Sequence, residues 1–362
     1  MSGPPLRVAF DVTSVISGRT GIARYTTQLS AAIERHGVEL CRYAVGRATF
    51  ALPSGTRHLR VPARVAERWW RAVPSPPIER LVGGADLVHA TGMLAPPATR
   101  LPLVMTVHDI AALRHEVLHP PRQVRQLRRQ IDALARASAI LAVSRATADD
   151  LADLGVARER IVVAPLGVTL LPEPRPPSEG DRPAGSYLLT VGESSPRKRY
   201  DLVLRALALL EGDLELVMAG PPADDEPRLR SLAHRFGLES RVRRVGPVSD
   251  TTLAGLYDRA LALCFPSVAE GFGLPVLEAM AAGLPVVTSD LPVIRELAGD
   301  AAVYVDGQDE QAWTEAIHRI ASDDSLRARV SEAGRRRASE FTWERTAART
   351  LEAYRLALEA AS

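Results

Sequence analysis

The chain is poor in cysteine and lysine, and it has no long apolar run. Its only cysteines, Cys41 and Cys264, lie far apart in apolar surroundings, so they form neither a disulfide framework nor a zinc-binding set. No run reaches the roughly 18–20 apolar residues of a membrane span, and the N-terminal segment lacks a signal-peptide pattern. We therefore expect free thiols, no metal site and a cytoplasmic protein.

The sequence also lacks an excess of either charge. Its 45 basic and 43 acidic residues leave a formal net charge of +2, which gives no general attraction for nucleic acid. The apolar fraction of 46% and the charged fraction of 24% are those of a globular protein rather than a disordered one. A length of 362 residues exceeds that of one ordinary core and predicts two domains.

Short apolar runs alternate with amphipathic stretches along the whole chain, and several runs have no polar alternation. This pattern predicts parallel strands covered on both faces by helices, in a doubly wound α/β fold. The expected strands are Arg7–Phe10, Leu87–His89, Leu103–Val107, Ile140–Val143, Ile161–Ala164, Tyr187–Val191, Leu214–Ala219, Arg241–Val245, Leu261–Phe265, Val286–Thr288 and Ala302–Val305. The expected helices include Arg24–Arg35, Leu202–Leu210, Pro227–Phe236 and Pro275–Ala282.

Residues 171–186 interrupt this alternation with five prolines and two glycines, which predicts a linker. We expect two Rossmann-like domains, 1–170 and 187–340, that face each other across a ligand-binding cleft. The tail, 341–362, predicts one helix that is capped by Thr342 and carries an apolar stripe at intervals of three or four residues. We expect this helix to pack across the domain boundary, although packing within the second domain fits the stripe equally well.

Only one of the 45 basic residues is a lysine. Lys198 follows Arg197 in "ESSPRKRYD", after a predicted strand and before a predicted helix. An ammonium is a compact point charge that suits phosphate oxygens, and the N-terminal end of a helix favours the same anion. The pair therefore predicts a diphosphate site. The alternatives are that codon drift toward arginine left a single lysine by accident, and that the loop is an ordinary solvated basic turn.

Two further stretches join strands to helices, where α/β sheets bind ligands. Gly18 and Gly21 flank a turn after the first strand, and such glycines let an anion reach helix amides, although the segment also fits a mere turn. The block "FPSVAEGFGLPVLEAMAAGLPVVTSD" holds Glu270 in a loop and Glu278 within the next helix. Carboxylates accept hydrogen bonds from sugar hydroxyls, so the two acids predict contacts along an extended ligand. Glu278 alone would also fit an acid that stabilises its helix.

The Glu-x7-Glu block resembles the signature of glycosyltransferase family 4, whose members are retaining enzymes of the GT-B fold. Similar stretches run along nearly the whole chain, namely "GRTGIARYTTQL", "TVHDIAALRHEVLHPPR", "ILAVSRATADDL", "VGESSPRKRYDLVLRAL" and "LPVIRELAGDAAVYVD". These forms look most like the mannosyltransferase-like branch. The chain departs from the pattern at Glu193, where some members have a basic residue, and this leaves the phosphate charge to Arg197 and Lys198.

The resemblance implies a role for each matching residue. It places Glu270, His108, Arg197 and Lys198 at the reaction centre. It assigns donor binding to Glu278, Gly271, Phe272, Gly273, Leu274, Gly18 and Gly21, and it places Asp109 and Arg24 on the acceptor side. Without the resemblance, we would interpret His108 as a structural histidine at the end of a strand, with its hydrogen bonds satisfied within the protein. Residues 1–170 would then bind the acceptor, and residues 187–340 the nucleotide sugar.

The function implied is transfer of a hexose from a nucleoside diphosphate sugar to a hydroxyl or amine of a glycan, glycolipid or natural-product precursor, with retention of the anomeric configuration. GDP-mannose is the favoured donor, and UDP-GlcNAc, other UDP-hexoses and deoxysugar nucleotides are the alternatives. We expect no metal or other cofactor, because the two cations can replace a divalent ion. Peripheral membrane contact through Trp69, Trp70 and the arginine-rich helix 122–136 is weighed against a solvated helix face.

Three other function classes are considered. A sugar-nucleotide epimerase shares the two-domain architecture and would convert the donor with no acceptor present. A non-catalytic sugar-nucleotide binding protein would bind the diphosphate and release no nucleotide. An NAD-dependent dehydrogenase fits least, because neither glycine loop matches the dinucleotide fingerprint.

Overall fold

The computed structural model describes residues 4–18, 20–73, 75–92, 97–174, 185–306 and 309–361. Residues 175–184, which make up most of the predicted linker, lie outside these ranges. The chain divides into two compact units: the first comprises residues 1–167 and 341–362, and the second comprises residues 168–340. Each unit has its own parallel sheet, as predicted for a doubly wound α/β fold.

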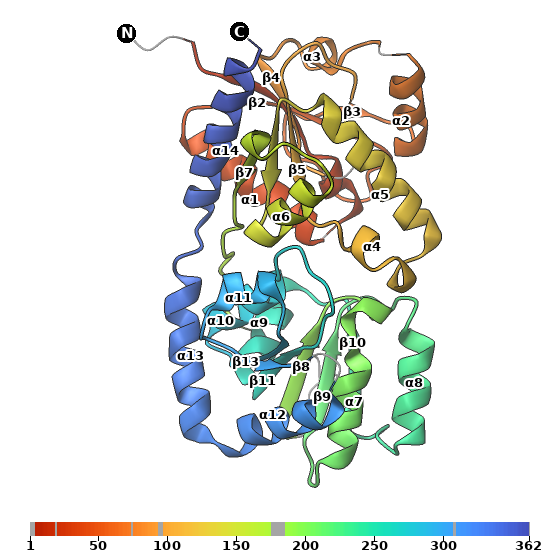
Figure 1. The fold of residues 1–362 in the computed structure, drawn as a ribbon, viewed down its shortest axis with the longest axis vertical. Helices are drawn as coiled ribbons and strands as arrows, with labels where there is room; N and C mark the ends of the chain where they lie inside the picture. The colour runs from red at the N-terminus through yellow and green to blue at the C-terminus, as the bar shows by residue number, and fades with distance from the viewer. Residues whose placement is uncertain are drawn as a thin grey trace. The chain divides into compact units, whose positions relative to one another are not determined.

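The first unit is built on a seven-stranded sheet in the order β3-β2-β1-β4-β5-β6-β7, whose strand pairs are parallel (Figure 1). Its strands are β1 (Arg7–Asp11), β2 (Glu39–Val45), β3 (Arg57–Leu59), β4 (Leu87–Ala90), β5 (Leu103–Val107), β6 (Ala139–Ala142) and β7 (Ile161–Val163). Its α-helices are α1 (Gly21–Arg35), α2 (Ala63–Ala72), α3 (Ile78–Leu81), α4 (Ala111–Arg114), α5 (Pro121–Ala133), α6 (Arg145–Asp153) and α14 (Trp343–Glu359).

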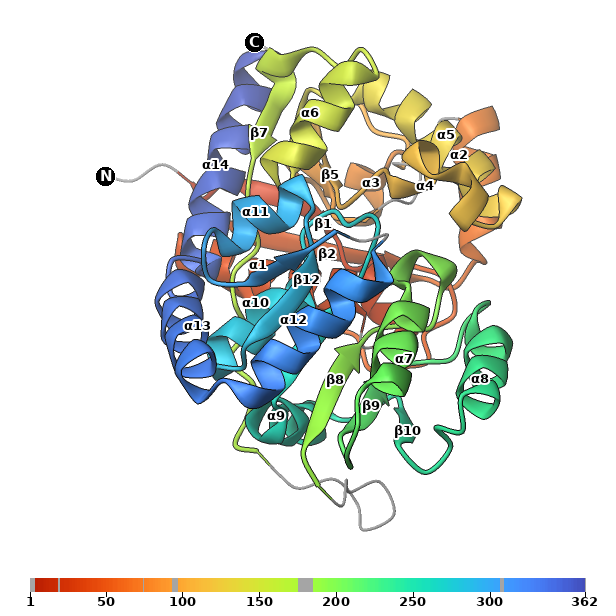
Figure 2. The ribbon, with the colours of Figure 1, turned by 60° about the horizontal axis from the view of Figure 1, so that its bottom comes forward.

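The second unit is built on a six-stranded parallel sheet in the order β10-β9-β8-β11-β12-β13 (Figure 2). Its strands are β8 (Tyr187–Val191), β9 (Glu215–Ala219), β10 (Val242–Gly246), β11 (Ala262–Phe265), β12 (Val286–Ser289) and β13 (Val303–Val305). Its α-helices are α7 (Tyr200–Leu209), α8 (Glu226–Arg235), α9 (Asp250–Arg259), α10 (Leu274–Ala282), α11 (Pro292–Ala298), α12 (Glu310–Ser322) and α13 (Asp324–Ala338).

The order of the strands determines where each unit can bind a ligand. In the first sheet the direction of winding reverses next to β1, and in the second it reverses next to β8. At such a reversal the loops on either side diverge, which leaves a crevice at the carboxyl ends of the central strands. In the second unit, the loops that follow β8 and β11 therefore lie beside this crevice.

The strands that were predicted from continuous apolar runs are present. Leu103–Val107 and Tyr187–Val191 have the predicted bounds, and all five residues of Leu103–Val107 are buried. Two strands of the first unit, β2 and β3, were not predicted. The polar residues Glu39 and Arg42 interrupt the apolar pattern of β2, and β3 has only three residues, Arg-His-Leu.

The helix predicted at the C-terminal end packs within the first unit, against α1 and β6. It is capped as predicted, since Thr342 Oγ1 accepts a hydrogen bond from the Arg345 N–H. Its contacts with the sheet include a buried hydrogen bond of 2.8 Å between Tyr354 Oη and His89 Nδ1. Thr346 Oγ1 also donates to the Pro165 carbonyl. These contacts and the buried Trp343, on the predicted apolar stripe, assign the helix to the first unit rather than to the second.

Both cysteines are free thiols, Cys264 buried in the second sheet and Cys41 half-buried in the first. Burial raises the pKa of Cys264 to about 12, so this thiol stays protonated at physiological pH. Within the ranges that the structure describes, no helix combines the length and the apolarity needed to cross a bilayer.

Candidate functional site

The loop after β8 carries the basic pair that was predicted to bind a diphosphate. A 3₁₀ turn, Pro196–Lys198, leads into α7 through Arg199, whose φ of 48° lies in the left-handed region that non-glycine residues rarely adopt. The loop is tied to its neighbours at both ends, since the Ser194 N–H donates to the Pro221 carbonyl and the Val268 N–H donates to the Arg197 carbonyl. The strained backbone is therefore held by contacts with two adjacent loops, as is common at ligand sites.

A close glycine contact fixes the base of this loop. Gly220, which follows β9, has a φ of 137°, and a Cβ built on it would lie 2.1 Å from the Gly192 carbonyl oxygen. No side chain can be placed there without moving the loop after β8. The contact therefore requires glycine for both conformational and steric reasons.

Arg197 and Lys198 share one buried carboxylate. Arg197 Nη1 lies 2.6 Å and Lys198 Nζ 2.7 Å from the same oxygen, Glu270 Oε1. The side chains of Arg197, Lys198 and Glu270 are only 15%, 7% and 11% exposed. Lys198 Nζ also lies 4.6 Å from the centre of the Phe265 ring, within cation–π range. Two positive charges and one negative charge thus meet at the carboxyl ends of β8 and β11.

The protonation of this cluster follows from its burial and its charges. Burial alone would raise the pKa of Glu270, but the charges of Lys198 and Arg197 lower it to about 2. Burial lowers the pKa of Lys198, and the attraction of Glu270 opposes that effect. Glu270 is therefore ionised across the physiological range, and the cluster keeps an excess of one positive charge while both cations are protonated.

The second acid of the predicted pair is held separately. Gly273 caps α10 with a φ of 98°, and a Cβ there would lie 2.7 Å from Ile294 Cδ1. The helix begins at Leu274, so Pro275 occupies its second position rather than the first as predicted. Glu278 lies within α10, is 7% exposed and accepts a 3.1 Å hydrogen bond from the Tyr257 hydroxyl of α9. The loop residues between the two acids, Gly271, Phe272 and Gly273, are buried.

The remaining predicted residues lie in the first unit. Gly18 has a φ of 100°, and α1 begins at Gly21 after the cap Thr20, so both glycines flank the turn as predicted. His108 lies directly after β5, and its Nε2 donates a 2.8 Å hydrogen bond to the Thr91 carbonyl. Burial lowers the pKa of His108, so the ring is neutral near pH 7 and its Nδ1 carries the lone pair.

Two other first-unit residues were predicted to lie on the acceptor side. Arg24 is half-buried in the first turn of α1. Asp109 Oδ1 accepts a 3.2 Å hydrogen bond from the Ala111 N–H at the start of α4. Asp109 also acts to raise the pKa of His108 by its charge, against the larger effect of burial.

The predicted residues thus form two groups, one in each unit. The sequence did not identify several residues that position them. Tyr25 packs edge-on against His108 with ring centres 4.8 Å apart. Tyr257 contacts Glu278, and Phe265 contacts Lys198. These three aromatic residues lie in ordinary helix and strand patterns, so no local signal distinguished them from core residues.

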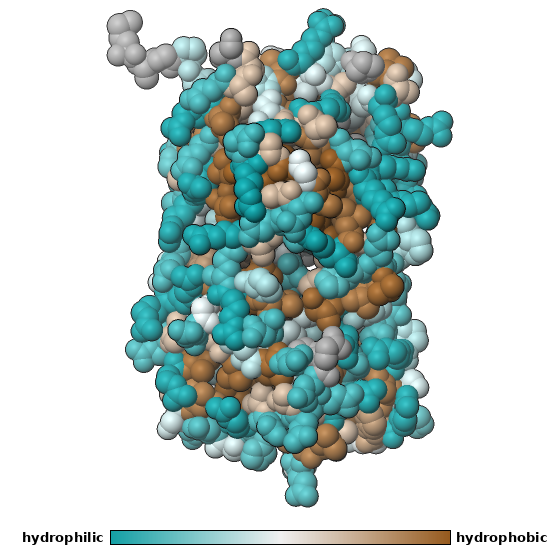
Figure 3. Space-filling model, viewed as in Figure 1, coloured by the Kyte–Doolittle hydropathy of each residue, from teal (hydrophilic) through white to brown (hydrophobic). Residues whose placement is uncertain are grey.

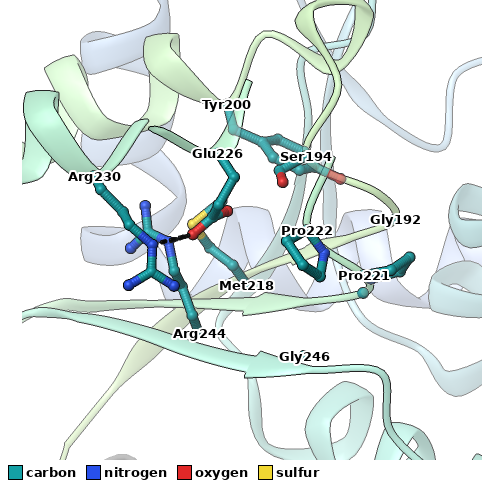
Figure 4. Close-up of a pocket in the computed structure, with 11 residues that line it drawn as sticks. Gly192, Ser194, Tyr200, Met218, Pro221, Pro222, Glu226, Arg230, Arg244 and Gly246 are labelled. Atoms are coloured by element: carbon teal, nitrogen blue, oxygen red, sulfur yellow. Dashed lines mark hydrogen bonds and ion pairs between the residues drawn. The ribbon is translucent and has the colours of Figure 1, made fainter. Parts of the chain in front are cut away.

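A small pocket lies beside the loop after β8 (Figure 4). Its volume is about 110 Å³, and it is lined by Gly192, Ser194, Tyr200, Met218, Gly220, Pro221, Pro222, Glu226, Arg230, Arg244 and Gly246. Glu226 Oε1 lies 2.7 Å from the Nε atoms of both Arg230 and Arg244. The volume is well below the roughly 300–1,000 Å³ of small-molecule sites. The pocket therefore backs the loop and is too small for a nucleotide.

Among the residues that the structure describes, no three His, Cys, Asp or Glu side chains lie together as a group that could hold a metal ion. The charges gathered at the strand ends of the second unit are instead those of Arg197, Lys198 and Glu270. Such an arrangement can hold an anion at the cations and accept hydrogen bonds from hydroxyls at the carboxylate.

Comparison with known proteins assigns the family. The sequence model described as Glycosyltransferase Family 4 matches residues 19–170, and the one described as Glycosyl transferases group 1 matches residues 176–337. O-antigen chain mannosyltransferase B of Escherichia coli is 32% identical to this chain over 70% of each protein. The chain belongs to glycosyltransferase family 4.

Other members of family 4 align over most of the chain. A D-inositol 3-phosphate glycosyltransferase of Xylanimonas cellulosilytica is 30% identical over 92% of this chain and 91% of that protein. These relatives are named transferases of sugars, so this family 4 chain is a glycosyltransferase enzyme.

Solved structures confirm the predicted GT-B fold. Sucrose-phosphate synthase of Thermosynechococcus elongatus superposes with a TM-score of 0.78 at 21% identity, covering 99% of this chain and 100% of that one. HepE of Anabaena, in complex with UDP and glucose, superposes with a TM-score of 0.75 at 21% identity, covering 96% of this chain and 99% of that one. The likeness to these distant structures concerns the fold of the family 4 chain.

Proposed function

We propose that this glycosyltransferase moves a hexose from a nucleoside diphosphate sugar to an acceptor hydroxyl or amine, with retention of the anomeric configuration. GDP-mannose is the favoured donor. This choice is supported by the relatives named mannosyltransferases, which include an MMP alpha-(1->4)-mannosyltransferase of Mycolicibacterium hassiacum at 33% identity. The use of a nucleotide sugar is supported by the UDP and UDP-glucose bound to a structural neighbour.

The observation that carries this proposal is the shared contact of Arg197 and Lys198 with Glu270 Oε1. Glu270 neutralises one of the two cations, so the pair can still attract a diphosphate to its remaining charge. The buried position strengthens that attraction, because little water screens it. We assign the diphosphate to Arg197 and Lys198, the hydroxyls of the donor sugar to Glu270, and the ribose hydroxyls to Glu278.

The proposed reaction needs no covalent intermediate on the protein. The bond between the anomeric carbon and the diphosphate oxygen breaks, and the acceptor oxygen or nitrogen attacks the same face of the sugar. The departing diphosphate oxygen takes the proton of the acceptor, so the atoms and charges balance. Arg197 and Lys198 stabilise the charge that develops on that oxygen, which is an electrostatic contribution made by groups already in position.

We further propose that the reaction needs no metal ion, because these two cations supply the charge that a divalent ion would provide. Glu193 is exposed at the start of the loop, where some family members have a basic residue, and it adds no positive charge. We assign Gly18 and Gly21 to the donor, His108 to the reacting sugar, and Arg24 and Asp109 to the acceptor side. As a neutral ring whose Nε2–H is bound to the Thr91 carbonyl, His108 would accept a hydrogen bond from a sugar hydroxyl at Nδ1 rather than carry charge.

The donor can be identified before the acceptor. Titration calorimetry with GDP and with UDP tests the nucleotide, and an NMR time course with GDP-mannose, UDP-glucose and UDP-GlcNAc tests slow turnover to free sugar. We expect GDP to bind more tightly and GDP-mannose to be hydrolysed with and without added chelator. Tighter binding of UDP would replace the proposed donor, and loss of turnover with chelator would overturn metal independence.

The same time course separates transfer from other chemistry. Conversion of the donor to an epimer, with no nucleotide released, would contradict the proposed reaction. Binding of the nucleotide with no turnover in the presence of crude membrane lipids, glycans and small-molecule extracts would favour a non-catalytic protein.

A further inference from the structure

A basic groove lies in the first unit, between α2 and α5. Its volume is about 790 Å³, and Figure 3 shows hydrophilic side chains over these helices at the upper right. Arginines of both helices dominate its lining, namely Arg64, Arg68 and Arg71 of α2 and Arg122, Arg125 and Arg129 of α5. None of them was assigned to the donor, the acceptor or the reaction.

The charge of this groove is mostly unbalanced. Glu67 pairs with Arg71 at 2.5 Å, one turn away on α2. In the described parts of the chain, no carboxylate forms an ion pair with the other five arginines, which are Arg64, Arg68, Arg122, Arg125 and Arg129. Like charges at a spacing of three or four residues on a helix repel each other. An anionic partner would remove that repulsion on both helices.

An exposed apolar stripe runs beside the basic residues of α2. Val65 and Trp69 lie one turn apart on α2 and are 54% and 56% exposed, and Val61 and Val73, just outside the two ends of the helix, are 41% and 44% exposed. The core-facing side of the helix is separate, since Ala66 is buried there. Trp69 is fixed in place by a 2.8 Å hydrogen bond from its Nε1 to the Ser75 carbonyl. The helix therefore presents one buried face, one basic face and one exposed apolar face.

We propose that α2 and α5 dock on a bilayer surface rich in anionic phospholipid. The arginines would bind lipid phosphates through their planar forks, and Val65 and Trp69 would enter the boundary between headgroups and acyl chains. A tryptophan suits that boundary because its ring is apolar and its N–H is polar. A soluble polyanion would account for the arginines but not for the valine and tryptophan stripe. The proposal concerns a surface of the first unit, whereas the loop after β8 belongs to the second, and it does not depend on the identity of the donor.

Co-sedimentation with vesicles tests the charged part of the surface. The probes are vesicles of phosphatidylcholine alone and of phosphatidylcholine mixed with phosphatidylglycerol. The variant replaces Arg64, Arg68, Arg125 and Arg129 by glutamine. The control replaces four exposed arginines on helices of the second unit by glutamine, so the net charge changes by the same amount. These are Arg235, Arg319, Arg329 and Arg336. We expect the intact chain to bind only the mixed vesicles.

Each basic residue near an anionic membrane surface raises the binding affinity roughly fivefold. The variant that lacks four of them should therefore bind the mixed vesicles about 100-fold more weakly or worse. The control variant should bind almost as well as the intact chain. Equal losses in the two variants would mean that net charge alone drives the association, and the assigned surface would be wrong. Retained binding in the groove variant would also overturn it.

The apolar part is tested by Val65→Ser and by fluorescence. Trp69 is the most exposed tryptophan, since Trp313 and Trp343 are buried and Trp70 is half-buried. Mixed vesicles should shift its emission to shorter wavelength, and Trp69→Phe should remove most of that shift while binding persists. Val65→Ser should weaken vesicle binding several-fold. If Val65→Ser binds normally and heparin binds as tightly as vesicles do, the groove holds a polyanion and the membrane proposal fails.

Discussion

Both units bury polar side chains in or just after their central strands. Besides the buried Asp11 of β1, the first unit holds a network of neutral hydrogen-bonding groups, whereas the second gathers a cluster of charges. In the first unit, His89 of β4 lies fully buried between Tyr354 and Thr106, with hydrogen bonds of 2.8 and 2.9 Å. The Tyr25 hydroxyl forms a 2.9 Å hydrogen bond with the same Thr106. Burial and the nearby His108 lower the pKa of His89 to about 3, so its ring is neutral at pH 7.

The second unit gathers Arg197, Lys198 and Glu270 into one buried contact instead. A satisfied neutral network costs little, because each hydrogen bond to water is replaced by one within the protein. Buried charges cost several kcal/mol each before their attraction is counted. The hydrogen bonds of the first network account for its burial, whereas the charged cluster of the second unit keeps one uncompensated positive charge, as the proposed diphosphate site requires.

Glu270→Gln should have the largest effect. The amide keeps the shape of the side chain but removes the negative charge, so Arg197 and Lys198 are left without their partner. Sugar transfer should fall by about 100-fold or more, because an interaction with the reacting sugar is lost. Calorimetry should show that the nucleoside diphosphate binds at least as tightly as before. Weaker nucleotide binding in a folded variant would place Glu270 among the groups that support the diphosphate.

Lys198→Ala should have the next largest effect, on binding. Loss of a buried charged hydrogen-bond donor should weaken nucleoside diphosphate affinity by roughly 10- to 100-fold. Lys198→Arg should also weaken it, because Glu270 and the Phe265 ring leave room for a compact ammonium rather than a planar fork. Arg235→Ala, an exposed cation of the same unit, is the control. Unchanged affinity in Lys198→Ala would remove the phosphate role.

His89→Gln tests the neutral network through pH. As pH falls below 6.5, the unfolded chain protonates this histidine, whereas the folded chain does not until about pH 3. Stability should therefore fall with falling pH across this window, by about 1.4 kcal/mol per unit for one histidine. Denaturant titrations between pH 6 and pH 4 give the free energy of unfolding as a function of pH. The slope of this plot should be shallower by that amount in His89→Gln than in the intact chain, and the exposed His318→Gln should keep the slope of the intact chain. Equal slopes would mean that His89 is charged in the folded chain.

Arg35→Gln should have the smallest effect. Arg35 of α1 pairs with Glu344 of α14 at 2.5 Å, but the two side chains are 57% and 62% exposed. Surface ion pairs of this kind contribute about 0–1 kcal/mol because water screens them. Denaturant titration should show a loss of less than about 1 kcal/mol. A larger loss would show that α14 depends on this pair more than on its buried contacts, including Tyr354 with His89.

The elements that followed from the sequence are those with an uninterrupted local signal. The strands Leu103–Val107 and Tyr187–Val191 are runs of apolar and β-branched residues with no charged residue, so their bounds were predicted correctly. The strand β2 was missed because Arg42, which pairs with Glu34 at 2.6 Å, interrupts the run. An internal strand can contain a charged residue when that residue pairs with one elsewhere in the chain. The local sequence pattern does not reveal the partner, so the strand could not be predicted from it.

The same limit applies to the candidate site. The basic pair and Glu270 could be named because they stand in unusual loops, and the structure brings them into contact. The residues that position the site come from distant segments, as when Tyr257 of α9 hydrogen-bonds Glu278. Tertiary contacts of this kind join residues whose own surroundings read as ordinary core.

The return of α14 to the first unit has a consequence for synthesis on the ribosome. Residues 168–340 form a unit that lies between two segments of the other one. The later-made unit can therefore complete its core while the earlier-made one still lacks the helix that supplies Tyr354 and Trp343. Domains usually fold in the order in which they emerge. Here the N-terminal sheet must wait, with His89 lacking one of its partners, until α14 (Trp343–Glu359) has been translated.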